Sequence, residues 1–134
     1  MASYNGGDII EISYNHPLGS GVLSPKASED NEYDFGGVRT NDDEAMVTSK
    51  GEAIYSMNAK RWSASAVVAS DMNVRQEYEK MVAIAGSLDE ATWTFLHING
   101  TTYKGKGKPV GDLKLNVNQS TFSLKISGGS IFTQ

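Results

Sequence analysis

The chain has 134 residues, of which 39% are hydrophobic, and we expect residues 1–134 to fold as a single domain. Its formal net charge of −4 argues against a dedicated nucleic-acid binder, and the absence of cysteine excludes a disulfide framework and a thiolate metal site. No apolar run approaches the roughly 20 residues that a membrane-spanning helix needs, so we expect no membrane contact.

The N-terminal part of the sequence predicts two extended segments followed by a long acidic loop. Residues 8–14 form the first predicted strand, and a second extended stretch ends near Leu23. Over residues 24–43 the hydrophobic periodicity disappears, and seven carboxylates lie between positions 29 and 44 against a single arginine. Loops of this length are uncommon in compact domains and are commonly functional. Because Tyr33, Phe35 and Val38 lie within it, we expect this loop to become ordered against a partner surface.

The middle of the sequence predicts a hairpin, a strand and one amphipathic helix. Residues 45–48 and 52–57 flank Lys50 and Gly51 and predict the hairpin, and residues 61–70 predict the strand. A helix over residues 73–85 would begin at Asn73 as its cap and end at Gly86. Its apolar face would consist of Val74, Tyr78, Met81, Val82 and Ala85.

The C-terminal part predicts four further strands. Residues 91–98 and 101–106 flank Asn99 and Gly100, a strong hairpin signal, and residues 113–117 and 121–126 alternate polar and apolar side chains. The pattern is typical of a mainly β protein with one α-helix, built as an antiparallel sandwich or barrel. We expect its core to contain Trp62, Val68, Tyr78, Met81, Trp93, Phe95, Leu115, Phe122 and Leu124.

Residues with catalytic or metal-binding chemistry are few and scattered. His16 and His97 each lack the second histidine or carboxylate that a metal site needs, so we interpret them as strand-end or surface residues. Asp42, Asp43 and Glu44 lack the spacing of a calcium loop and predict a solvated turn. No serine lies in a Gly-x-Ser-x-Gly elbow. The sequence therefore predicts a protein that is not an enzyme and holds no cofactor.

Lys104, Lys106 and Lys108 form a basic stripe that alternates with Gly105, Gly107 and Pro109. Phosphate binding is one interpretation, although the segment lacks the Gly-x-x-x-x-Gly-Lys-Ser/Thr pattern of a phosphate loop. If a strand continues through the segment, the lysines share one face and the glycines lie opposite. Like charges in a row protect a sheet edge, so we favour an edge that faces solvent or another subunit. Residues 63–70 carry no such charges and predict an unprotected edge.

Several short phrases together make the chain resemble the tail tube proteins of contractile-tailed bacteriophages and related injection machines. These phrases are residues 35–43, 57–63, the helix at 73–85, 104–112 and 124–129. The resemblance implies two packed antiparallel sheets with a helix at the flank. It also implies that six copies join edge to edge into a ring lined by a continuous β-barrel. The rings would stack into a tube inside a contractile sheath.

The resemblance assigns roles to the residues named above. The loop at residues 24–43 would contact neighbouring rings through Tyr33, Phe35, Val38, Arg39, Asp42 and Asp43. The stripe of Lys104, Lys106 and Lys108 would lie at a subunit edge or face the sheath. Expected partners are further copies of the chain and the sheath, tape-measure and baseplate proteins. Double-stranded DNA would be present only while it passes through the channel of the tube, whose inner wall would carry negative charge. The protein would assemble in the host cytoplasm and reside in the virion tail.

Two alternatives remain open at this point. A tube-initiator or tail-completion protein of the same fold would form one ring without polymerising. A non-viral β-sandwich module would bind carbohydrate or protein through Trp62, Trp93 or the lysine stripe. The oligomeric state separates the module from the two assembly proteins.

Overall fold

The computed structural model describes residue 4 and residues 6–29, 31–40, 46–73 and 76–129. In these residues the chain is mainly β, with one α-helix and antiparallel pairing throughout, as the sequence predicts. The elements in chain order are β1 (Ile9–His16), β2 (Gly19–Leu23), β3 (Glu32–Asp34), β4 (Gly37–Thr40), β5 (Met46–Val47), β6 (Ala53–Ile54), β7 (Met57–Lys60), β8 (Trp62–Ala69), α1 (Glu77–Ala85), β9 (Ala91–His97), β10 (Thr102–Pro109), β11 (Leu115–Asn116) and β12 (Thr121–Gly128).

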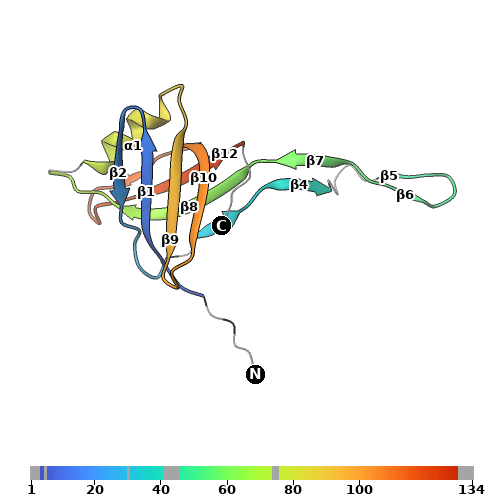
Figure 1. Ribbon diagram of the computed structural model, residues 1–134, viewed down its shortest axis with the longest axis horizontal. Helices are drawn as coiled ribbons and strands as arrows, with labels where there is room; N and C mark the ends of the chain where they lie inside the picture. The colour runs from blue at the N-terminus through green and yellow to red at the C-terminus, as the bar shows by residue number, and fades with distance from the viewer. Residues whose placement is uncertain (1–3, 5, 30, 41–45, 74–75, 130–134) are drawn as a thin grey trace.

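An eight-stranded sheet forms the body, in the order β2-β1-β9-β10-β12-β8-β3, with β11 beside β12. The sheet bends sharply at β10, which pairs with β9 over Thr102–Gly107 and with β12 over Lys108 and Pro109. In Figure 1, β1, β9 and β10 stand side by side while β8 and β12 run across behind them. The bend therefore gives two layers, one of β2, β1, β9 and the first part of β10, the other of β12, β8 and β3.

The core lies between the two layers and follows from alternation along the strands. In β8 and β12 every second residue is buried, and the same period holds for most of β9. Seven of the nine predicted core residues are buried, whereas Tyr78 and Leu115 are half-buried and pack against the core. The buried hydrophobic residues are Ile9, Ile12, Tyr14, Leu23, Trp62, Ala64, Ala66, Val68, Met81, Ile84, Ala91, Trp93, Phe95, Phe122, Leu124 and Ile126.

Both tryptophans fix the bend in β10. The Trp62 Nε1–H donates to the Lys106 carbonyl at 3.0 Å, and the Trp93 Nε1–H donates to the Gly107 carbonyl at 3.0 Å. Gly105 is needed here because a Cβ at this position would lie 2.8 Å from two ring carbons of Trp62. Trp62 and Trp93 are fully buried, so neither is available as the binding-site aromatic of a β-sandwich module.

The helix α1 is shorter than predicted and turns a slightly different face to the core. It begins at Glu77 instead of near Asn73, since Gln76 takes a left-handed backbone conformation (φ 51°) immediately before it. Glu77, Met81 and Ile84 are buried, whereas Val82, predicted on the apolar face of the helix, is exposed. The helix ends before Gly86, as predicted.

Side-chain contacts at the start of α1 hold the helix against the sheet. The Ser70 Oγ accepts a hydrogen bond from the Tyr78 N–H at 3.2 Å, and the Glu77 carboxylate accepts one from the Asp71 N–H at 2.6 Å. The Tyr78 hydroxyl donates to the Leu113 carbonyl at 2.7 Å, and its ring packs edge-on against Phe122. These contacts join the helix to the second layer of the sheet. The predicted face residue Val74 lies outside the described residues.

The described residues of the segment 24–43, which are 24–29 and 31–40, are not the structureless loop that the sequence predicts. The β3 strand within this segment pairs with β8, and β4 pairs with β7. The preceding residues also run along β8, where the Ala69 N–H donates to the Ser24 carbonyl and the Lys26 N–H to the Val67 carbonyl, both at 2.8 Å. Consequently β8 has partners on both sides, and the prediction of an unprotected edge at residues 63–70 is wrong.

A two-stranded arm projects from the body. It consists of β4 and β7, followed further out by the hairpin of β5 and β6, and Figure 1 shows it extending well beyond the sheet. The hairpin around Lys50 and Gly51 is as predicted, with Met46 opposite Ile54 and Val47 opposite Ala53. We refer to Gly37–Thr40 and residues 46–60 as the arm.

Candidate assembly surfaces

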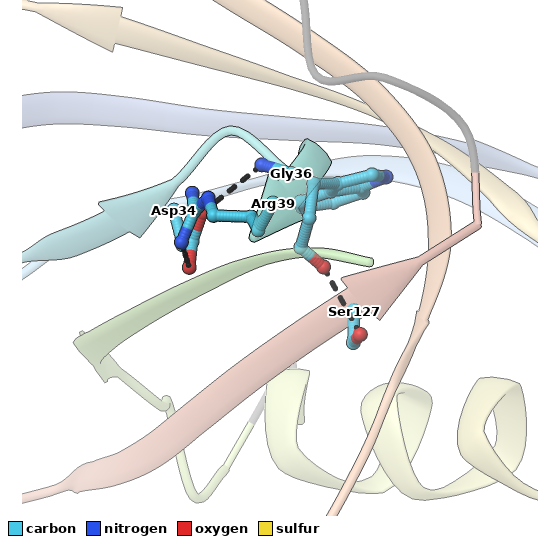
Figure 2. Close-up of polar contacts among 5 residues, drawn as sticks. Asp34, Gly36, Arg39 and Ser127 are labelled. Atoms are coloured by element: carbon cyan, nitrogen blue, oxygen red, sulfur yellow. Dashed lines mark hydrogen bonds and ion pairs between the residues drawn. The ribbon is translucent and has the colours of Figure 1, made fainter. Parts of the chain in front are cut away.

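The base of the arm is a sharp change of direction between β3 and β4. Gly36 has a φ of 74°, and a Cβ there would lie 2.7 Å from the Lys60 carbonyl oxygen, so only glycine fits. The Asp34 carboxylate accepts a hydrogen bond from the Gly36 N–H at 3.0 Å and forms an ion pair with Arg39 (Figure 2). The ion pair with Arg39, together with the Gly36 N–H, lowers the pKa of Asp34 below its ordinary value. These contacts join β4, the first strand of the arm, to β3, the strand at the end of the sheet order of the body.

On the other side of the arm base, the strand enters the core directly. β7 and β8 are separated by Arg61 alone, and the Trp62 that follows is fully buried. The Ser127 hydroxyl donates to the Trp62 carbonyl at 3.0 Å, which joins this strand to β12 (Figure 2). The arm is thus a continuation of the β3–β8 pair beyond the edge of the core.

Apolar side chains are exposed along the arm. Their exposed fractions range from 40% to 68%, and the residues concerned are Val38, Met46, Val47, Ile54, Tyr55 and Met57. Only Val38 among them was predicted as a contact residue. The sequence signal for the others is a short, turn-rich hairpin that carries apolar residues without the alternation of a half-buried strand. An isolated two-stranded ribbon is at best marginally stable in water, so this surface is suited to being covered.

The predicted contact residues of the loop at residues 24–43 do not form one surface. Tyr33 packs inside its own subunit, with ring centroids 5.4 Å from Phe95 and 5.8 Å from Tyr103. This burial, and secondarily Tyr103, raises the pKa of Tyr33. Tyr33 is therefore unsuited to anchor a neighbouring ring, because it already completes the core of its own chain.

The remaining predicted contact residues differ in their placement. Phe35 lies at the arm base, 43% exposed, with its ring 5.6 Å from Tyr103. Val38 and Arg39 lie on the arm itself. Asp42 and Asp43 lie outside the described residues, as does the solvated turn predicted for them with Glu44.

The basic stripe follows the outward face of β10. Lys104 and Lys106 are exposed and Lys108 is half-buried, while Gly105 and Gly107 point toward Trp62 and the Ser127 carbonyl. The shared face with glycine opposite is thus as predicted. The predicted edge position is wrong at Lys108, where β12 covers β10, whereas the part of β10 that carries Lys104 and Lys106 pairs with β9 alone among the described strands.

Small polar side chains cover the outward face of the first layer. The register places Ser20, Asn15, Thr92 and Lys106 in one row across the four strands, and Val22, Ser13, Thr94 and Lys104 in the next row. A shallow hollow of about 590 Å³ lies over these two rows, between β2 and β9. The sequence did not indicate this face, since the pairing of β1 with β9 joins residues about eighty positions apart.

Residues with catalytic or metal-binding potential remain dispersed. His16 ends β1 but is buried, with Nδ1 accepting from the Leu18 N–H and Nε2 donating to the Asp89 carbonyl, each at 3.0 Å. His97 ends β9, where its Nδ1 accepts from the Asn99 N–H at 3.2 Å. Within the described residues, no three histidine or carboxylate side chains gather as a metal site would require. The described part of the chain also contains no helix long and apolar enough to span a membrane.

Comparison of the chain with models of known protein families and with curated protein sequences finds no match.

Proposed function

We propose that this protein is a structural assembly protein whose partner is a second copy of itself. In the form that the sequence resemblance suggests, six copies form a ring, and rings stack into the inner tail tube of a contractile phage or related injection machine. The tube would reside in the virion and conduct the genome during ejection. We propose no catalytic activity and no cofactor.

The exposed apolar surface of the arm is the main support for this proposal. Its exposed apolar residues, among them Val47, Tyr55 and Met57, lie on a two-stranded ribbon that lacks a sheet or helix of the described residues behind it. Covering a side chain of this kind contributes about 1.5–3 kcal/mol. A surface on another copy would supply that cover, and a contact between an arm and a body is head-to-tail, so it can propagate as a filament.

The first layer of the sheet supports lateral association. β2 ends the sheet order on one side, and on the other side the first part of β10 pairs with β9 alone among the described strands. Joining β10 of one copy to β2 of the next would extend this four-stranded layer. Six copies would then contribute roughly 24 strands, and barrel diameter grows about linearly with strand number.

Arm variants test the proposal. Val47→Ser with Ile54→Ser removes apolar surface from the arm, and Leu18→Ser with Val117→Ser is a matched control because both residues are exposed on the body. We expect the arm variant to stay folded by circular dichroism but to lose stacked assemblies in sedimentation and negative-stain microscopy. The control should assemble like the parent. Normal stacking of the arm variant would refute the role of the arm.

The two alternatives predict different outcomes. An initiator or tail-completion protein would give single rings that never stack, with the arm contacting a different protein. A β-sandwich binding module would remain monomeric at every concentration.

A further inference from the structure

The outward face of β2, β1, β9 and β10 concentrates positive charge in a protein that is acidic overall. The two rows that end at Lys104 and Lys106 contain hydroxyl, amide and valine side chains and no carboxylate. Glu11 lies one row away from Lys104, opposite Leu96, and Glu90 precedes Thr92 by two residues at the start of β9, so these carboxylates lie beyond the two rows and not within them. These two rows therefore carry positive charge, although the formal net charge of the chain is −4.

Lys104 and Lys106 are regularly spaced along β10 on this face. Because residues two apart on a strand point the same way, their Cα atoms repeat at about 6.8 Å. Gly105 and Gly107 press against Trp62 and the Ser127 carbonyl on the other side, which fixes the strand. The ion pairs among the described residues are Lys26–Glu29 and Arg39–Asp34, and none of the three lysines takes part. Their charge is thus available to a ligand.

We propose that this face binds the phosphate backbone of a nucleic acid without reading its sequence. Lys104 and Lys106 would contact successive phosphates, and the Thr92, Thr94 and Asn15 side chains can donate hydrogen bonds to phosphate oxygens. The two rows present no outward aromatic side chain on which bases could stack, so contacts to the backbone dominate. A wall of this composition differs from the negative wall that the resemblance implies.

The location of this face in a channel rests on the proposed function, but phosphate binding by the isolated subunit does not. The experiment is fluorescence anisotropy of a short labelled DNA duplex titrated with the full chain at several salt concentrations. The test variant is Lys104→Gln with Lys106→Gln. The matched control is Lys80→Gln with Lys114→Gln, which removes the same charge from exposed positions elsewhere.

We expect the parent to bind the duplex at low salt, with affinity falling as salt rises. Loss of two phosphate contacts should lower the affinity at least about tenfold and reduce the slope of log K against log salt by about 1.8. The control should stay within about twofold of the parent, since nonspecific charge alone is worth little at a distance.

Three results would overturn the proposal. They are no binding at the lowest salt, an equal loss in the control variant, or equally tight binding of polyglutamate with the same dependence on Lys104 and Lys106. The last result would identify an acidic protein as the partner. Subunits that bind the duplex but never assemble would support this inference while refuting the proposed tube.

Discussion

Replacing Gly105 with alanine tests the packing that bends the sheet at β10. The added methyl group would lie 2.8 Å from two ring carbons of Trp62, far closer than ordinary contact. Trp62 has little freedom to yield because it is fully buried and its Nε1–H donates to the Lys106 carbonyl at 3.0 Å. Overpacking of a core costs about 1–3 kcal/mol, and loss of the indole hydrogen bond adds about 1 kcal/mol.

We therefore expect Gly105→Ala to lower the free energy of unfolding by about 2–4 kcal/mol. For a domain of this size the melting temperature should fall by about 3–5 °C for each kcal/mol. Gly129→Ala is the control, because a Cβ at that position meets no atom within 4 Å. Urea unfolding followed by tryptophan fluorescence measures both. A Gly105→Ala protein within about 0.5 kcal/mol of the parent would show that the corner is not closely packed.

Three further predictions concern the helix, the half-buried Tyr33 and the arm base. Met81→Ala should lower the free energy of unfolding by about 2–5 kcal/mol because Met81 is fully buried, whereas Val82→Ala on the exposed face should lower it by under about 0.5 kcal/mol. Similar losses in the two variants would mean that the helix face is misassigned. Burial raises the pKa of Tyr33 above its ordinary 10.0, so its contribution to stability is present below pH 10 and is lost as pH rises through the folded pKa. Because burial also raises the pKa of Tyr14, Tyr33→Phe should remove one of the late-ionising phenols from an ultraviolet titration and leave that of Tyr14, and an unchanged late step in absorbance would contradict the assignment. Arg39→Gln should raise the pKa of Asp34 toward 3.8, as measured by NMR titration, and an unshifted titration would exclude the ion pair in solution. Since the folded pKa of Asp34 is depressed in the parent, the stabilisation is present above pH 3.8 and is lost as pH falls through the folded pKa.

The body of the fold could be predicted from the sequence because its strands alternate buried and exposed residues. This pattern placed β1, β8, β9 and β12 within one or two residues of their observed bounds. Asn99 and Gly100 likewise identified the β9–β10 hairpin, where the His97 N–H donates to the Thr101 carbonyl at 2.8 Å.

The arm strands could not be predicted in the same way. Three of the four residues of β4 and all four of β7 are exposed, so they carry no alternation between a wet and a dry face. Their pairing depends on the turn at Gly36 and on the continuation of β8, which are tertiary features. The acidic composition of residues 24–43 concealed β3 for the same reason, since Tyr33 is its one residue that reaches the core.

The phase of the helix and the environment of β10 also depended on tertiary contacts. Val82 and Ile84 are equally apolar, and the contacts that hold α1 on the body, among them those of Tyr78 with Leu113 and Phe122, are not visible in the sequence spacing. The alternation of lysine and glycine correctly gave the outward face of β10. It gave no information about β12, which comes from later in the chain and pairs with Lys108 and Pro109.

The most direct test of self-assembly is the oligomeric state of the purified full chain over a wide range of concentrations. Light scattering and negative-stain microscopy of the same samples give the mass and the shape of the particles. We predict sixfold rings that stack into tubes as the concentration rises. A monodisperse monomer at every concentration would contradict self-assembly and favour the binding-module alternative.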